Sequence, residues 1–290
     1  MPKALSFTPD VVVYHDQCND GLCAAAIAYG VFGDTPIYVP MQYQTPVPAV
    51  IEKGGRGILF LDFVPYREIF DSFIGRWDNW FVIDHHADHS WILERGPNVV
   101  FGLDHSAAWL TWDVLGAKGY KRPKLVDYVQ DRDLWKWALP NSREISAAIM
   151  EWRKFTPSQW WDALADTEVD GLDALIDKGT TILDVHQAIA TSAAKKSVRV
   201  VLHDTNVRMV NCTTLISETC NAILDLYDDV DVAVGFFFVG DDKVVMSFRS
   251  RPGVACNTLA QAVSDQGGGH PQAAGASVSV EEFFKLLEVL

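Results

Sequence analysis

Short apolar runs that lead into an acid or a histidine recur in the first part of the chain. They occupy residues 11–14, 57–62 and 80–86, and the first is rich in β-branched and aromatic side chains. Runs of this length with apolar residues on both faces predict the buried strands of a parallel sheet. Small residues at 22–28 predict a helix after the first strand. Ligands of parallel α/β sheets gather at the carboxyl ends of the strands, so these acids and histidines lie where a site would form.

The middle of the chain has helical rather than strand-like spacing. From about residue 106 to residue 195 the apolar positions follow a helical period, and many of them are tryptophans. Residues 171–197 contain no proline and predict one long helix, because proline would interrupt it. We expect this helix to connect two domains.

Strands return in the last third of the chain. They are predicted at 198–202, 207–212, 230–239 and 243–249, followed by a glycine-rich loop at 267–269 and a final helix from about Val280. A length of 290 residues favours two domains over one. We therefore expect an α/β protein with a parallel-sheet domain and helical connector at residues 1–190 and a smaller α/β domain at 198–290.

Charge narrows the class of partner. The formal net charge is −14, with 24 Lys and Arg against 38 Asp and Glu. Proteins that bind long nucleic acid tightly present a large basic surface that releases counterions. This balance disfavours tight binding of long duplex DNA and favours a small phosphorylated substrate held locally by metal ions and a few basic groups.

Other features of composition concern the compartment. No apolar run approaches the length needed to span a bilayer, so no membrane association is expected. The first residues lack an apolar signal region, and the five cysteines are scattered. This pattern is typical of reduced thiols, and we expect a cytoplasmic protein.

The candidate chemistry centres on Asp84-His85-His86 at the end of the third strand. Adjacent histidines in a strand-to-loop turn can face different partners, one a metal ion and the other a substrate. Further candidates lie at comparable positions: His15, Asp20, Asp62, Asp131 and Asp133. Oxygen and nitrogen ligands of these kinds suit Mn²⁺, Co²⁺ or Zn²⁺. Other roles stay open, since Asp62 could cap a helix and Asp131 or Asp133 could pair with Arg132.

In this order the residues resemble the DHH phosphoesterase superfamily. The N-terminal motifs are His15…Asp20-Gly21, Leu61-Asp62, Asp84-His85-His86 and Asp131. The run at 267–275, Gly-Gly-Gly-His-Pro-Gln-Ala-Ala-Gly, is similar to the signature of the DHH-associated C-terminal domain, and 248–250 resembles its upstream Arg-Ser element. The resemblance spans nearly the whole chain.

The resemblance implies a role for each matching position. His15, Asp20, Asp62, His85 and Asp131 would bind metal ions, and Asp62 would bridge two of them. His86 and Asp62 would be catalytic. Asp84 and Asp133 would orient the side chains that bind the metal ions. The substrate would be bound by Arg249, Ser250, Gly268, Gly269 and His270, where glycines let backbone N–H groups approach phosphate oxygens closely.

The implied activity is hydrolysis of phosphodiester or phosphomonoester bonds in short oligonucleotides or cyclic nucleotides. Water would be activated by two divalent ions, most typically Mn²⁺, with Mg²⁺, Co²⁺ or Zn²⁺ as alternatives. The active site would lie in the cleft between the two domains, and a homodimer is compatible with the sequence. Two rivals remain: an inorganic pyrophosphatase or polyphosphatase, and a non-catalytic nucleotide sensor.

Two positions add specific expectations. The first motif of the family commonly has two aspartates, but Cys18 stands where the first would fall. Cys18 could ligate as a thiolate, Asp16 could substitute, or one metal site could be weakened. Among the tryptophans, which more often form core, Trp135 is the best candidate for stacking on a nucleobase.

Overall fold

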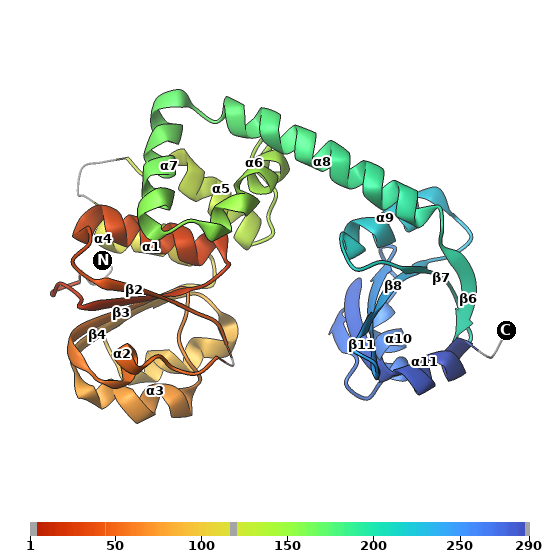
Figure 1. The fold of residues 1–290 in the computed structure, drawn as a ribbon, viewed down its shortest axis with the longest axis horizontal. Helices are drawn as coiled ribbons and strands as arrows, with labels where there is room; N and C mark the ends of the chain where they lie inside the picture. Colours follow the sequence, from red (N-terminus) through yellow and green to blue (C-terminus); the bar gives the residue numbers. More distant parts are fainter. Residues whose placement is uncertain (1–4, 44, 117–120, 288–290) are drawn as a thin grey trace. The chain divides into compact units, whose positions relative to one another are not determined.

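The computed structural model describes residues 5–43, 45–116 and 121–287, and it divides into two compact units, Met1–Thr180 and Thr181–Leu290 (Figure 1). The division falls inside helix α8 (Asp173–Ala194), which occupies most of the long helix expected from the sequence. Each unit has a sheet of its own, so the expected α/β class is confirmed. None of the helices among the described residues combines the length and apolarity that a bilayer span requires.

The first unit is built on a five-stranded parallel sheet in the order β2-β1-β3-β4-β5. Its strands are β1 (Val11–His15), β2 (Ile37–Met41), β3 (Gly55–Leu61), β4 (Trp77–Asp84) and β5 (Val99–Phe101). The helices are α1 (Asn19–Phe32), α2 (Ala49–Glu52), α3 (Arg67–Phe73), α4 (Ala107–Leu115), α5 (Lys124–Asp133), α6 (Ser142–Ala148) and α7 (Pro157–Asp170). Short 3₁₀ segments are η1 (Ile74–Arg76), η2 (Ala87–Arg95) and η3 (Ile149–Lys154).

Both faces of this sheet are covered by helices, as Figure 1 shows. Val12 and Tyr14 pack in the core that contains α1, α4 and α7, whereas Val11 and Val13 pack in the core on the α3 side. A strand that is buried on both faces has no polar alternation. This explains why the sequence of β1 is continuously apolar up to His15.

The second unit has a six-stranded sheet in the order β10-β11-β9-β8-β7-β6. Its strands are β6 (Val198–Leu202), β7 (Thr205–Asn211), β8 (Val232–Val239), β9 (Lys243–Ser250), β10 (Gly268–His270) and β11 (Ala273–Ser279). Its helices are α9 (Ile216–Leu226), α10 (Cys256–Val263) and α11 (Val280–Leu287). The pairs are antiparallel except β7 with β8.

The structure differs from the expected elements in a few places. The glycine-rich segment predicted as a loop contains strand β10, which pairs with β11. Strand β2 was not predicted because it contains Pro40 and lies at the edge of its sheet, where a missing N–H is tolerated. Helices α9 and α10 were also not predicted, since the strand pattern dominated that part of the sequence.

Candidate active site

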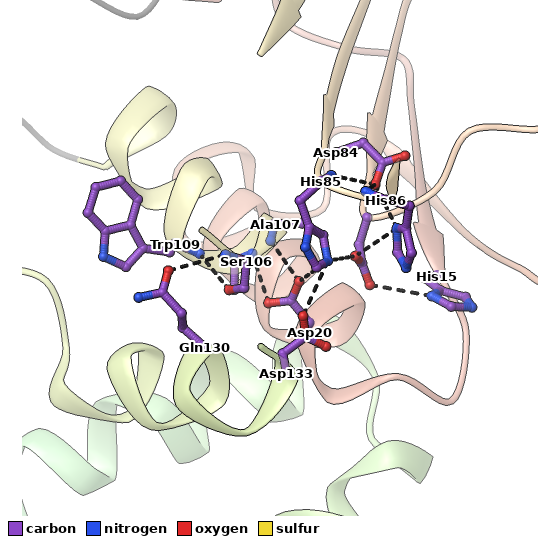
Figure 2. Close-up of polar contacts among 12 residues, drawn as sticks. His15, Asp20, Asp84, His85, His86, Ser106, Ala107, Trp109, Gln130 and Asp133 are labelled. Carbon is purple, nitrogen blue, oxygen red and sulfur yellow. Dashed lines mark hydrogen bonds and ion pairs between the residues drawn. The ribbon is translucent and has the colours of Figure 1, made fainter. Parts of the chain in front are cut away.

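Side chains from separate elements meet at the carboxyl edge of the parallel sheet. His15 is the last residue of β1, Asp62 directly follows β3, and Asp84 ends β4 just before His85. Figure 2 shows His85 pointing toward Asp20 of α1 and Asp133 of α5. The position predicted from the strand ends therefore holds a cluster of carboxylates and imidazoles.

Asp62 lies between two histidines and is fully buried. Its Oδ2 is 3.4 Å from Nδ1 of His15, and its Oδ1 is 3.3 Å from Nε2 of His85. Its backbone has φ 57, a region that non-glycine residues rarely adopt, and its N–H donates to the carbonyl of Ile83 at 2.9 Å. The next helix begins after Tyr66, so Asp62 is not a helix cap. The two oxygens of one carboxylate thus face two separate imidazoles.

Asp20 is held by the first turn of α4. Its two carboxylate oxygens accept backbone N–H groups from Ala107 at 2.7 Å and Ala108 at 3.0 Å, where the helix dipole favours negative charge. Its Oδ2 lies 3.7 Å from Nε2 of His85. The neighbouring Gly21 allows this placement, since a Cβ there would lie 2.4 Å from the carbonyl oxygen of His15.

The fourth motif contributes Asp133 rather than Asp131. Asp133 Oδ2 lies 3.2 Å from Nε2 of His85, whereas the carboxylate of Asp131 accepts N–H groups from Ala138 and Leu139. Residues two apart on a helix do not face the same way, so only one of the two aspartates can enter the cluster. The geometry therefore favours Asp133 as the metal ligand, whereas the sequence led us to expect Asp131 as the ligand and Asp133 as its support. Neither pairs with Arg132 among the described residues.

The segment after β1 brings Cys18 to the cluster. Three possible ligand atoms lie within 4.8 Å of one another, one from each of His15, Cys18 and Asp62. Asp16 instead accepts the N–H of Gln17 at 2.9 Å and belongs to no such group within the described part of the chain. Of the three alternatives for this position, the geometry favours Cys18.

Asp84 fixes the turn that carries the two histidines. Its Oδ1 accepts the backbone N–H of His85 at 2.7 Å and lies 2.8 Å from Nδ1 of His86. His89 was not predicted from the sequence, yet its Nδ1 lies 3.7 Å from Oδ2 of Asp84 and 3.2 Å from the hydroxyl of Tyr43. In the sequence, the position of His89 three residues after His86 is the feature that could have indicated this contact; the segment forms η2.

The cluster carries excess negative charge in a buried position. Burial and the neighbouring Asp62 carboxylate raise the pKa of Asp20 well above its ordinary value. Burial acts to lower the pKa of His85, but Asp62 and Asp20 outweigh it and raise the pKa to about 9. Burial acts to raise the pKa of Asp62, and the two flanking imidazoles reverse this and lower the pKa. A cation among these groups would relieve the repulsion between the carboxylates.

Hydrogen-bonding capacity tests whether the residues fit metal ions. Several buried side-chain atoms have no hydrogen-bond partner: Nδ1 of His15, both oxygens of Asp62, Nε2 of His85 and Oδ2 of Asp133. Buried polar atoms are ordinarily paired, and these unpaired atoms all face the cluster. Imidazole, carboxylate and thiolate groups are metal ligands, so the donor set fits divalent ions.

The second unit places the other predicted residues around β9 and β10. The guanidinium of Arg249 donates to the hydroxyl of Ser217 at 2.7 Å, and the hydroxyl of Ser250 donates to the carbonyl of Val254 at 2.6 Å. Gly269 has φ 135, and a Cβ there would lie 2.6 Å from the carbonyl oxygen of Ala273. Gly268 and His270 flank it in β10, where His270 is exposed. The structure therefore brings Gly268, Gly269 and His270 together on one edge strand.

Comparison with known proteins shows a domain match and a relative of similar sequence. Residues 200–290 match the DHHA1 domain. An uncharacterized protein of Acanthamoeba polyphaga mimivirus is 25% identical over an alignment that covers 93% of this chain and 68% of that protein.

Two solved structures share the fold. The pGpG-specific phosphodiesterase PggH from Vibrio cholerae has a TM-score of 0.54 and 14% identity, over 96% of each chain. RecJ from Thermus thermophilus, in complex with Mn²⁺, has a TM-score of 0.52 and 15% identity, over 96% of this chain and 50% of RecJ. These two proteins share the fold of this chain, and the DHHA1 match covers its last third, in line with the resemblance drawn from the sequence.

Proposed function

We propose that this chain, with its DHHA1 domain and DHH-family fold, is a metal-dependent phosphoesterase that hydrolyses phosphodiester or phosphomonoester bonds of short oligonucleotides or cyclic nucleotides. The observation that carries the proposal is the Asp62 carboxylate, whose two oxygens face His15 and His85 separately. One group of donors is His15, Cys18 and Asp62, and another is Asp20, His85 and Asp133. Asp62 faces both groups and is therefore the residue that would bridge two ions.

The ions would be held by His15, Cys18, Asp62, Asp20, His85 and Asp133. When bound, two such ions supply a water of lowered pKa and neutralise charge on the phosphoryl oxygens. The binding of Mn²⁺ by RecJ, which shares the fold, supports Mn²⁺ as the ion. Cys18 adds a soft ligand at one position, which favours Zn²⁺ there more than two aspartates would.

His86 is suited to act on the leaving group. Asp84 holds Nδ1 of His86, so the opposite nitrogen remains for the substrate, and its side chain is 34% exposed. Burial acts to lower the pKa of His86, but Asp84 and Asp62 outweigh it and raise the pKa. A raised pKa favours the protonated imidazole, which can donate a proton to a departing oxygen.

In the second unit, Arg249 and the strand Gly268–His270 are proposed to bind the substrate. Arg249 is half-buried and contacts one serine hydroxyl, and a guanidinium matches the geometry of a phosphate. The backbone at Gly269 lies close to β11. The edge strand β10 therefore carries no bulky side chain at this position. Ser250 is occupied with Val254, so its role would be to shape the turn that follows β9.

The test is hydrolysis of a substrate panel with added Mn²⁺. The panel contains 5′-labelled short oligonucleotides, cyclic dinucleotides, adenosine 3′,5′-bisphosphate, pyrophosphate and a long DNA duplex. We expect turnover of a short nucleotide member, and loss of several orders of magnitude in Asp62→Asn. Exclusive turnover of pyrophosphate would favour the rival pyrophosphatase activity, and a variant with near-normal rate would contradict the role of Asp62.

A non-catalytic nucleotide sensor is the remaining rival, because Cys18 departs from the family pattern. The geometry does not show a degraded site, since Cys18 completes a donor group with His15 and Asp62. Metal content separates the two cases: the proposed enzyme binds two ions per chain, and a sensor with a lost site binds fewer.

A further inference from the structure

The loop that follows α5 presents two tryptophans beside the proposed metal ligands. Trp135 and Trp137 lie two and four residues after Asp133, and Trp135 is 67% exposed. Their ring centroids lie 5.0 Å apart in an edge-to-face arrangement. The Trp135 ring faces solvent two residues along the chain from Asp133, a proposed metal-binding residue. Such an exposed aromatic surface is available to a substrate.

The backbone of this loop is strained at both tryptophans. Trp135 has φ 55 and Trp137 has φ 51. Bulky residues rarely adopt this left-handed region, because Cβ approaches the neighbouring carbonyl oxygen, and glycine or asparagine would fit with less strain. Strain of this kind persists where the surrounding structure enforces it, and it concentrates at functional sites.

Asp131 is the residue that enforces this conformation. Its buried carboxylate accepts the N–H groups of Ala138 at 2.9 Å and Leu139 at 3.2 Å. Its backbone carbonyl accepts the N–H groups of Lys136 at 2.9 Å and Trp137 at 3.4 Å. The loop is therefore wrapped around one aspartate, which ties the position of the tryptophans to the end of α5 and to the ligand Asp133.

Unpaired cations lie against the same rings. The guanidinium carbon of Arg132 is 5.7 Å from the Trp135 ring, and that of Arg143 is 4.6 Å from the Trp137 ring. Within the described residues neither arginine forms an ion pair, and Nε of Arg153 is buried without a hydrogen-bond partner. In a chain with a net charge of −14, arginines that form no ion pair beside the exposed ring of Trp135 and the half-buried ring of Trp137 suit a ligand that combines a flat base with a phosphate.

We propose that Trp135, supported by Trp137 and Arg132, is a subsite that stacks a nucleobase of the substrate beside the metal-binding cluster. The inference rests on the proposed function and deepens it, because it specifies an unpaired, base-bearing nucleotide as the substrate class. Every base has a flat face, so stacking binds bases with little preference among them. Asp131 acts here as a positioning residue that holds the loop.

Binding of a non-hydrolysable dinucleotide and of its abasic counterpart, measured by calorimetry, tests this subsite. In Trp135→Leu, which keeps an apolar side chain but no ring, affinity for the dinucleotide should fall about tenfold or more. Trp135→Tyr should retain most of the affinity, and the abasic ligand should bind Trp135→Leu and the unaltered protein alike. Met150→Ala, at another exposed apolar residue, serves as the control. Equal affinity of Trp135→Leu for the dinucleotide, or equal loss for both ligands, would overturn the subsite.

A substitution to glycine separates binding from folding. Because Trp135 is exposed and its φ suits glycine, Trp135→Gly should leave Tm unchanged or raise it while affinity for the dinucleotide falls. A clear drop in Tm would show that the ring stabilises the fold instead. These measurements do not depend on turnover, so a panel without hydrolysis would contradict the proposed function and leave the binding result to decide on the subsite.

Discussion

At the scale of single residues, the site depends on buried donor atoms that face the cluster without a hydrogen-bond partner. Asp62 is buried between two imidazoles, and Asp20 uses both oxygens on the N-terminus of α4 while it also faces His85. Cys18 differs from the other proposed metal-binding residues, because it offers sulfur where they offer oxygen or nitrogen. Burial and the Asp62 carboxylate raise the pKa of its thiol well above the ordinary value, so a thiolate there would need a bound cation.

We expect substitution of this cysteine to change the preference of the site for one metal ion over another. Cys18→Asp should tighten Mn²⁺ and weaken Zn²⁺, because a carboxylate is a harder ligand than a thiolate. The ratio of the two dissociation constants, measured by competition against a chelating dye, should shift about tenfold or more. The control is Cys212→Ser in the second unit, which should leave both constants unchanged. An unchanged ratio in Cys18→Asp would show that Cys18 is not a ligand.

At the scale of elements, the ends of β1, β3 and β4 could be predicted because continuous apolar runs stop at polar residues. His15, Asp62 and the Asp84–His86 turn followed from this pattern. The choice between Asp131 and Asp133 could not be made from the sequence, since both lie near the end of one helix and spacing does not show which face is turned inward. His89 reaches Asp84 only through the 3₁₀ course of η2, for which the sequence gives no clear signal.

The two aspartates of α5 should therefore respond differently to the same substitution. Asp133→Asn should lower the number of metal ions bound per chain. Asp131→Asn should keep the metal content but lower the free energy of unfolding by about 1–3 kcal/mol, because buried backbone N–H groups lose a charged acceptor. Elemental analysis and urea denaturation measure the two effects. The opposite pattern, with metal lost in Asp131→Asn alone, would restore the assignment made from the sequence.

At the scale of the whole molecule, charge and architecture agree with a small substrate. The net charge of −14 opposes the approach of a long polyanion, whereas Arg132 at the end of α5 and Arg153 in η3 form no ion pair within the described residues. The proposed metal ligands all lie in the first unit, whereas the match to the DHHA1 domain lies in the second. The long duplex in the substrate panel should accordingly be a poor substrate at physiological salt.

Anomalous diffraction from a crystal grown with Mn²⁺ tests most directly whether Asp62 bridges two divalent ions. We expect two anomalous peaks about 3.5–4 Å apart on either side of the Asp62 carboxylate, one near His15 and Cys18 and the other near His85, Asp20 and Asp133. A single peak, or two peaks that the Asp62 carboxylate does not join, would contradict the account.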